Sequence, residues 1–122
     1  MDEQTVTIGG QEVRLSAPAS EAIRTEIAFA AGGNYLRGSW AALGACWRGK
    51  GRPAATYAQA RHDPLVYGAM VYDELRARGI PRREIATAAA VALALVSSDI
   101  LDGREVTEKE GFTGRTPGDS TS

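Results

Sequence analysis

The feature that most constrains this chain is the order in which its sequence patterns follow one another. Thr5 to Leu15 alternate apolar and polar residues on both sides of Gly9-Gly10, the pattern of two strands joined by a tight turn. About eighty residues with helical periodicity follow, and the chain then becomes polar. This order predicts a mainly α fold: a small helical domain of four or five helices preceded by an N-terminal β-hairpin, with a disordered polar C-terminal tail.

The same patterns set the expected boundaries. We expect a single domain over residues 1–102, with the hairpin at 5–15 and the helices within 17–102. Residues 103–122 are predicted to form a flexible polar tail. Val106 and Phe112 are the only large apolar residues of that segment, so it cannot bury enough surface to offset the entropy lost on ordering.

Cap signals divide the first part of the helical segment in two. Pro18, with Ser16, Ala17 or Ser20 as the cap, predicts a helix that ends near Ala31 and is terminated by Gly32-Gly33 in a left-handed conformation. A second helix is expected from Asn34 to about Trp47, where Gly38 and Gly44 would let another backbone come close. Its predicted buried stripe consists of Leu36, Trp40, Leu43 and Trp47.

Two more long helices are predicted from clear start signals. Asp63-Pro64 is an N-cap followed by proline, which predicts a helix to Arg78 terminated by Gly79. The next helix is expected from Pro81 to about Leu101. The predicted inward positions are Leu65, Ala69, Tyr72 and Leu75 or Arg76 on the first, and Ile85, Ala89, Ala92 or Leu93, Val96 and Ile100 on the second. The segment 54–61 is expected to be a short helix or an ordered turn.

Charge and cysteine content narrow the class of protein. The net charge is −1, so the chain as a whole has no attraction for nucleic acid or membrane. Residues 34–62 nevertheless carry five basic residues and no acid, a net of +5, which is interpreted first as a solvated face. The single Cys46 allows no internal disulfide and indicates a reducing cytoplasm. The apolar run Ala86–Val96 is too short to span a bilayer.

No constellation of residues predicts an enzyme, a cofactor or a metal site. His62 and Cys46 are each alone of their kind, and Asp63 beside His62 is accounted for as a helix cap. Cys46 is expected to be a small core residue, and His62 an exposed loop residue. Asp73-Glu74 are adjacent on a helix and so point about 100° apart.

Two weaker motifs indicate binding of phosphate or DNA. The glycine-rich basic loop Gly49–Pro53 lacks the strand–loop–helix setting of a nucleotide loop, so a solvated turn is favoured. Gly79–Arg83 joins two helices by a tight turn, as in a helix-turn-helix. The helix that follows is nearly all alanine and aliphatic residues, whereas a recognition helix needs polar side chains along its exposed face.

The hairpin sequence Thr-Val-Thr-Ile-Gly-Gly-Gln-Glu-Val-Arg-Leu, followed by a compact helical region and a polar end, resembles the tail assembly chaperones of long-tailed bacteriophages. Residues 67–79, Tyr-Gly-Ala-Met-Val-Tyr-Asp-Glu-Leu-Arg-Ala-Arg-Gly, are similar to a recurring helix of that family that ends in a glycine turn. The resemblance covers residues 5–101. It implies a non-enzymatic protein of the host cytoplasm. Such a protein binds the tape measure protein and keeps it soluble during tail morphogenesis. The tail tube protein is implied as a further possible partner.

From the residues we expect an apolar contact surface steered by cations toward an acidic partner. Its hypothetical members are Trp40, Trp47, Met70 and Tyr72, with Arg48, Lys50 and Arg52. Self-association through the edges of the hairpin is a further expectation. The alternatives are a small structural head–tail or tail protein of the virion and, less favoured, a small helical DNA-binding regulator.

Overall fold

The computed structural model describes the backbone of residues 3–111 and the side chains of residues 3–98. Its elements are β1 (Glu3–Ile8), β2 (Gln11–Ser16), α1 (Glu21–Gly33), α2 (Tyr35–Cys46), β3 (Trp47–Arg48), α3 (Pro64–Ala77) and α4 (Arg82–Gly111). The expected mainly α architecture with an N-terminal hairpin is confirmed.

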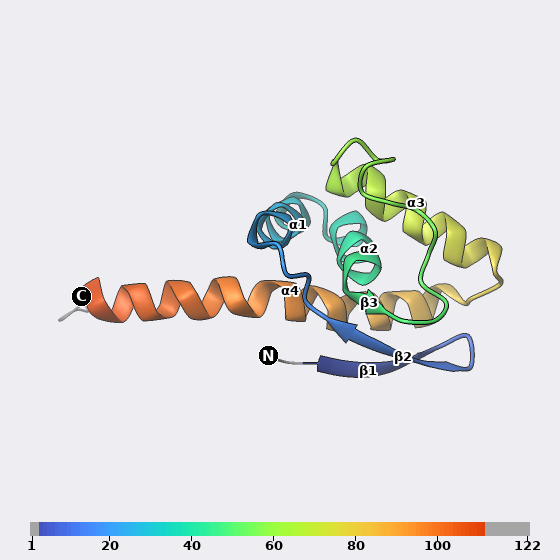
Figure 1. Cartoon of the computed structure of the whole chain (residues 1–122), viewed down its shortest axis with the longest axis horizontal. Coiled ribbons are helices and arrows are strands. Elements are labelled where there is room, and N and C mark those ends of the chain that lie inside the picture. Colours follow the sequence, from blue (N-terminus) through green and yellow to red (C-terminus); the bar gives the residue numbers. More distant parts are fainter. Residues whose placement is uncertain (1–2, 112–122) are drawn as a thin grey trace.

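Helix α4 organises the fold, as Figure 1 shows. Helices α1, α2 and α3 lie on one side of its first half and the hairpin lies on the other. The second half of α4 extends beyond the other elements. The core is therefore shared between the inner face of the hairpin, the first half of α4 and the helices above it.

The hairpin forms where the alternation predicts it. Val6 pairs with Val13, and the turn residues Gly9 and Gly10 have φ angles of 60° and 78°, which glycine adopts without strain. Its inward residues Ile8, Val13 and Leu15 are buried. Thr5 and Glu12 on the other face are exposed, so the hairpin has one apolar face, and that face covers the core.

A third strand extends the sheet. Trp47 and Arg48 form β3, which pairs with β2 in the order β1-β2-β3. Trp47 was predicted to end a helix, and this prediction was wrong because Trp47 belongs to the strand. The helix ends at Cys46 because Trp47 turns to an extended conformation, with φ −66° and ψ 127°.

Helices α1 and α2 meet at one residue. Ser20 caps α1 by accepting a hydrogen bond from the N–H of Ile23, as one of the expected cap candidates. The predicted left-handed ending at Gly32-Gly33 was wrong, because both glycines belong to α1 and neither has a positive φ. Asn34 instead ends α1 and caps α2, donating its backbone N–H to the Ala30 carbonyl.

Helix α2 is buried around most of its circumference. Leu43 is fully buried, but Leu36 is 57% exposed, so the predicted stripe was wrong at that position. The close approach expected at the glycines is confirmed: a Cβ at Gly38 would collide with the Ala31 backbone, and one at Gly44 would lie 2.6 Å from Cγ2 of Val71. Small residues let α1 and α3 pack against this helix at short range.

Helix α3 begins as predicted and presents a different face from the one expected. The Asp63 carboxylate accepts hydrogen bonds from the N–H groups of Leu65 and Val66, at 2.9 and 3.4 Å. Gly79, with φ 84°, ends the helical region. The buried residues are Tyr67, Gly68, Val71 and Leu75. Leu65, Ala69 and Tyr72 are only partly buried, and residues 54–61 form turns and bends without a helix.

The residues of helix α4 that were predicted to face inward do so where the structure describes them. Ile85, Ala89, Ala92 and Val96 are fully buried, whereas the side chain of Ile100 lies outside the described residues. The helix runs to Gly111, past its expected end, so residues 103–111 of the predicted tail are helical, and residues 112–122 lie outside the described residues. The sequence of the extension contains good helix formers, among them Arg104, Glu105 and Lys109.

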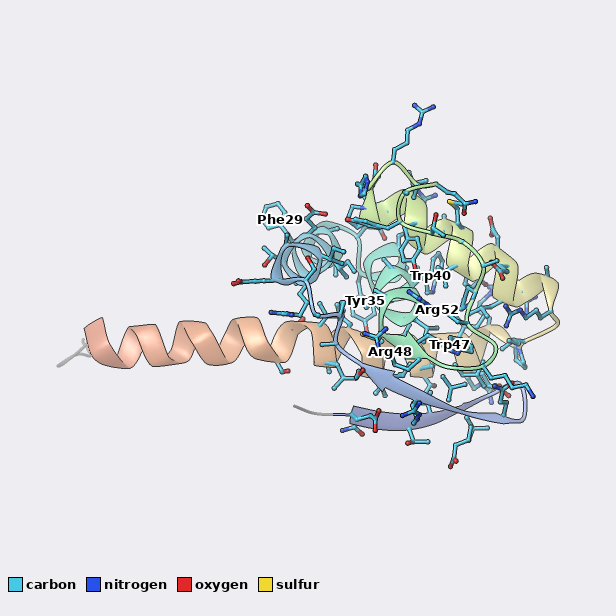
Figure 2. The ribbon with its side chains drawn as sticks, in the orientation of Figure 1. Phe29, Tyr35, Trp40, Trp47, Arg48 and Arg52 are labelled. Carbon is cyan, nitrogen blue, oxygen red and sulfur yellow. The ribbon has the colours of Figure 1, made fainter. Side chains whose placement is uncertain are left out.

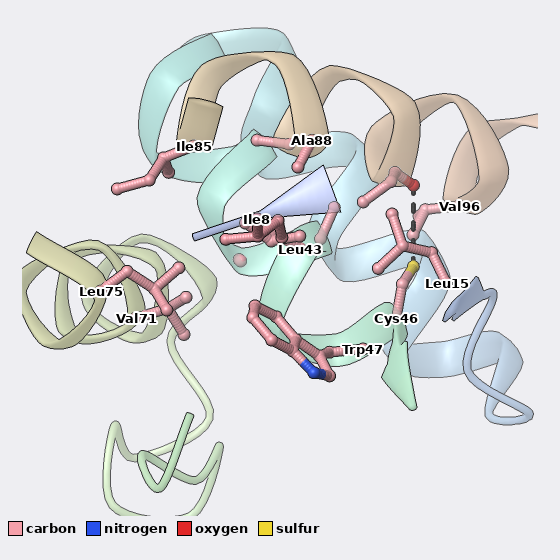
Figure 3. Packing of buried hydrophobic residues seen from close by; sticks show 14 of the residues in the cluster. Ile8, Leu15, Leu43, Cys46, Trp47, Val71, Leu75, Ile85, Ala88 and Val96 are labelled. Atoms are coloured by element: carbon pink, nitrogen blue, oxygen red, sulfur yellow. Dashed lines mark hydrogen bonds between the residues drawn. The ribbon is translucent and has the colours of Figure 1, made fainter. Parts of the chain in front are cut away.

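The core is centred on Trp47, whose indole is 2% exposed. Figure 3 shows it among residues of the hairpin, α2, α3 and α4. Fully buried neighbours include Leu15, Leu43, Val71 and Leu75. The indole N–H donates to the Lys50 carbonyl at 3.0 Å, so the polar edge of this large side chain is satisfied.

Candidate functional site

A groove with apolar walls opens where α2, α3 and α4 meet, and we call it the α2–α4 groove. It has a volume of about 390 Å³ and is lined by Leu36 and Trp40 of α2, Tyr72 of α3, and Arg82 and Ala86 of α4. The rings of Trp40 and Tyr72 stack with centroids 4.0 Å apart and planes at 22°. This stack gives the groove a flat aromatic wall.

One cation, Arg82, lines this apolar wall. The Arg82 guanidinium donates from Nε to the Tyr72 hydroxyl at 2.9 Å, which fixes the tyrosine and holds a cation over the groove. Arg37 and Arg83 are exposed on the adjoining turns of α2 and α4. None of these three arginines forms an ion pair within the part of the chain that the structure describes. Their charges are therefore available to a partner.

Apolar surface continues beyond the groove. Leu36 is 57% exposed at its edge and so adds apolar surface to that of the stacked rings. Along α4, Ala86, Ala90 and Ala94 are exposed at four-residue intervals, so they lie on one face of that helix. A surface of this kind lets another helix approach closely, because no bulky side chain keeps it away.

The structure brings together only part of the predicted contact surface. Trp40 and Tyr72 are in contact and half-buried, as the hypothesis requires. Trp47 is buried in the core and cannot contact a partner, so its inclusion was wrong. Met70 lies two residues before Tyr72, about 200° away around α3, and is therefore on the opposite flank. Met70 lies one turn from Glu74, whose carboxylate accepts hydrogen bonds from the backbone N–H groups of Ala54 and Ala55.

The predicted cations lie away from the groove and have different environments. Arg48 is half-buried, and its guanidinium donates from Nε to the Ser16 hydroxyl at 3.0 Å and from both Nη atoms to the carbonyls of Ser16, Ala17, Ala45 and Trp47. It therefore joins the end of β2 to the end of α2. Lys50 and Arg52 are exposed, as their hypothetical role requires.

Arg48 and Arg52 line a second hollow, which we call the α1–loop cavity. It has a volume of about 450 Å³ and lies between the start of α1, Ala45 of α2 and the loop of residues 52–57, with Tyr67 of α3 at its side. Figure 2 shows Arg48 and Arg52 close together near the middle of the molecule. At its edge the Tyr57 hydroxyl donates to Glu26 at 2.6 Å.

The cysteine and the histidine that were considered as catalytic candidates lie in different environments. Cys46 is fully buried, its thiol faces the Ala92 carbonyl at 3.7 Å, and burial raises its pKa to about 12. A thiol in this state is a poor nucleophile. His62 is exposed in a turn, with φ 58°, and contacts the Tyr57 ring edge-on. The described residues contain no group of three potential metal ligands.

Three residues of the α2–α4 groove were not predicted to belong to the contact surface. Leu36 was assigned to the buried stripe, and Arg82 was considered only for DNA binding. Ala86 carried no signal, since an alanine marks neither a core nor a surface position. Within residues 3–111 no helix has the length and apolar character needed to cross a bilayer. No family model matches the chain, and no curated protein or solved structure shows significant similarity to it.

Proposed function

We propose that this protein is a tail assembly chaperone of a long-tailed bacteriophage, which binds the tape measure protein in the host cytoplasm and keeps it soluble during tail morphogenesis. The observation that carries the proposal is the α2–α4 groove, where the stacked Trp40 and Tyr72 lie beside exposed Leu36 and the guanidinium of Arg82. A tape measure protein is long and helical, so its chaperone needs an apolar groove that accepts helices.

The shape of the groove supports a helical client. Its walls are three helices, and the exposed alanines of α4 continue from Ala86 away from the groove. A client helix lying along this face would place one large apolar side chain against Trp40 and pack its backbone near Ala90. Binding of an amphipathic helix in an apolar groove is a common mode of peptide recognition.

The positive charge at the groove supports an acidic client surface. Arg82 lines the groove, and the exposed Arg37 and Arg83 follow the lining residues Leu36 and Arg82 in the sequence; none of the three has a carboxylate partner among the described residues. Client helices with acidic residues flanking their apolar stripe would be attracted to it and oriented on it. This steering is weakened by salt, because exposed charges are screened within about 8 Å at physiological ionic strength.

The proposal is tested by co-expression with the long coil-forming protein encoded by the same phage, followed by size-exclusion chromatography with light scattering. We expect the client to be soluble only when this protein is present, and to elute with several copies of it. Mass spectrometry of purified particles completes the test, because a chaperone is absent from the virion and a structural tail protein is present. A client that stays insoluble, or particles that contain this protein, would contradict the proposal.

Two matched variants locate the client surface. Leu36→Glu places a charge at the groove, and Val66→Glu places the same charge on α3, where Val66 is 44% exposed. Gly68 of α3 packs against α2, and Val66 lies about 200° from Gly68 around the same helix. The Val66 side chain therefore points away from the groove. Both positions are in the first turn of a helix, where glutamate is favoured. We expect Leu36→Glu alone to abolish client solubilisation.

A further inference from the structure

The α1–loop cavity has two cations and no anion among its lining residues. Its lining contains the guanidinium groups of Arg48 and Arg52 and no aspartate or glutamate. Neither arginine forms an ion pair with another described residue. Arg48 is half-buried, Arg52 is exposed, and neither has a carboxylate partner among the described residues, so a cavity of this composition favours an anionic ligand.

Arg48 supplies a fixed charge. Its hydrogen bonds all go to neutral acceptors, namely four backbone carbonyls and the Ser16 hydroxyl. These bonds hold the guanidinium in one orientation, but they leave its net charge in the cavity wall. Because Arg48 has its donors occupied, it attracts an anion through space and does not bind it directly.

Arg52 supplies a second guanidinium at the mouth of the same cavity, and this guanidinium donates one hydrogen bond to the Tyr67 hydroxyl. Its side chain is exposed and lies near the Tyr67 phenol, whose pKa is raised by burial and lowered again by this guanidinium. The neighbouring Pro53 is buried and has a fixed φ, so the base of the side chain is held in place. A guanidinium fork of this kind matches a carboxylate.

The remaining wall is mostly apolar. Pro18 and Ile23 at the start of α1, Ala45 of α2, and Pro53 and Ala55 of the loop provide contact surface without charge. Tyr57 contributes its ring, because its hydroxyl proton is already donated to Glu26. A volume of about 450 Å³ lies within the range of about 300–1,000 Å³ that is typical of ligand sites.

We propose that the α1–loop cavity binds a carboxylate carried on an apolar body, with Arg52 as the direct ligand of the carboxylate and Arg48 as a fixed charge behind it. The site is separate from the α2–α4 groove, so this proposal does not depend on the proposed function. The ligand chemistry has two sources, a free aryl or alkyl acid and the C-terminal carboxylate of a peptide that ends in an apolar residue.

The test compares acids with their uncharged amides on the full chain. 3-Phenylpropionate and 3-phenylpropionamide are titrated by NMR, beside a short peptide ending in leucine as the free acid and as the amide. We expect the free acids to shift the backbone amide signals of Ala54, Ala55 and Thr56, and the amides to bind at least about tenfold more weakly. The tighter of the two acids identifies the source. Equal affinity of acid and amide, or no saturable shift with either acid, would overturn the proposal.

A pair of variants completes the test. Arg52→Gln removes the exposed guanidinium, and we expect it to weaken binding of the acid about tenfold or more without affecting the fold. Arg37→Gln removes an exposed arginine of α2 that does not line the cavity, and it serves as the control for net charge. If both variants weaken binding equally, the effect is one of overall charge and the assigned site is wrong.

Discussion

Gly68 is the position where one added methyl group has the most predictable effect on stability. An ideal Cβ on this residue of α3 would collide with the backbone carbonyl of Arg37 on α2, and it would lie 3.1 Å from the backbone nitrogen of Ala41. Both neighbours are backbone atoms of a helix, so no side-chain rotation can make room. Gly68→Ala therefore forces α2 and α3 apart and opens gaps beside Val71.

The size of the effect follows from two opposed terms. Overpacking of a core contact costs about 1–3 kcal/mol, and a contact with rigid backbone belongs at the upper end. Alanine is favoured over glycine inside a helix by about 1 kcal/mol. The expected net loss is about 2 kcal/mol. For a domain of this size, each 1 kcal/mol lowers the melting temperature by about 4–8 °C, so a fall of about 8–16 °C is expected.

Gly32→Ala is the matched control. Gly32 also lies inside a helix, but a Cβ there would meet no atom within 4 Å. This variant should stabilise the protein by about 0.5–1 kcal/mol, through helix propensity alone. Thermal melts followed by circular dichroism measure both variants. A Gly68→Ala protein as stable as the wild type would refute the inferred close packing of α2 on α3.

Three further predictions concern single side chains. Cys46 should not react with a thiol reagent in the folded protein and should react once urea unfolds it, because burial raises its pKa to about 12; rapid reaction of the native protein would contradict its burial. The pKa of Glu74 is lowered below 4.5, mainly by the hydrogen bond from the Ala54 N–H. Its stabilising contribution is therefore complete above pH 4.5 and is lost as the pH falls through its folded-state pKa. Urea melts should show a gap between wild type and Glu74→Gln that closes in acid, and a gap independent of pH would contradict the hydrogen bond. Asp63→Ala should lower stability by about 1 kcal/mol through loss of the α3 cap, while Asp63→Asn should retain most of it in the same melts.

The predictable parts of the fold are those with local signals. The Gly9-Gly10 turn, the Asp63-Pro64 cap and the inward residues of α4 each depend on a few adjacent residues or on a simple period. Strand β3 had no such signal, because two residues cannot show an alternation. Trp47 and Arg48 become a strand only because β2 offers hydrogen-bonding partners from far away in the sequence.

The faces of α2 and α3 could not be predicted from apolar periodicity. Gly38, Gly44 and Gly68 have no hydrophobic side chains, yet they mark the tightest helix contacts, so small size rather than hydrophobicity decides which sides face inward. For the same reason, the sequence could not predict the position of the α2–α4 groove. Leu36 looked like a core residue by spacing, but α3 crosses α2 at Gly68 and leaves Leu36 at the edge of the contact.

The corner at Asn34 has a consequence for how this chain tolerates change in length. Asn34 alone ends α1 and caps α2, so the connection has no loop residues that could accommodate an insertion. An insertion there would rotate one helix by about 100° relative to the other and separate Gly38 from Ala31. The segment from Gly49 to Asp63 contains no helix or strand and joins the same core, so it can change in length at much lower cost. Length variation among relatives of this protein should therefore be concentrated in that segment, and the α1–α2 corner should keep a constant length.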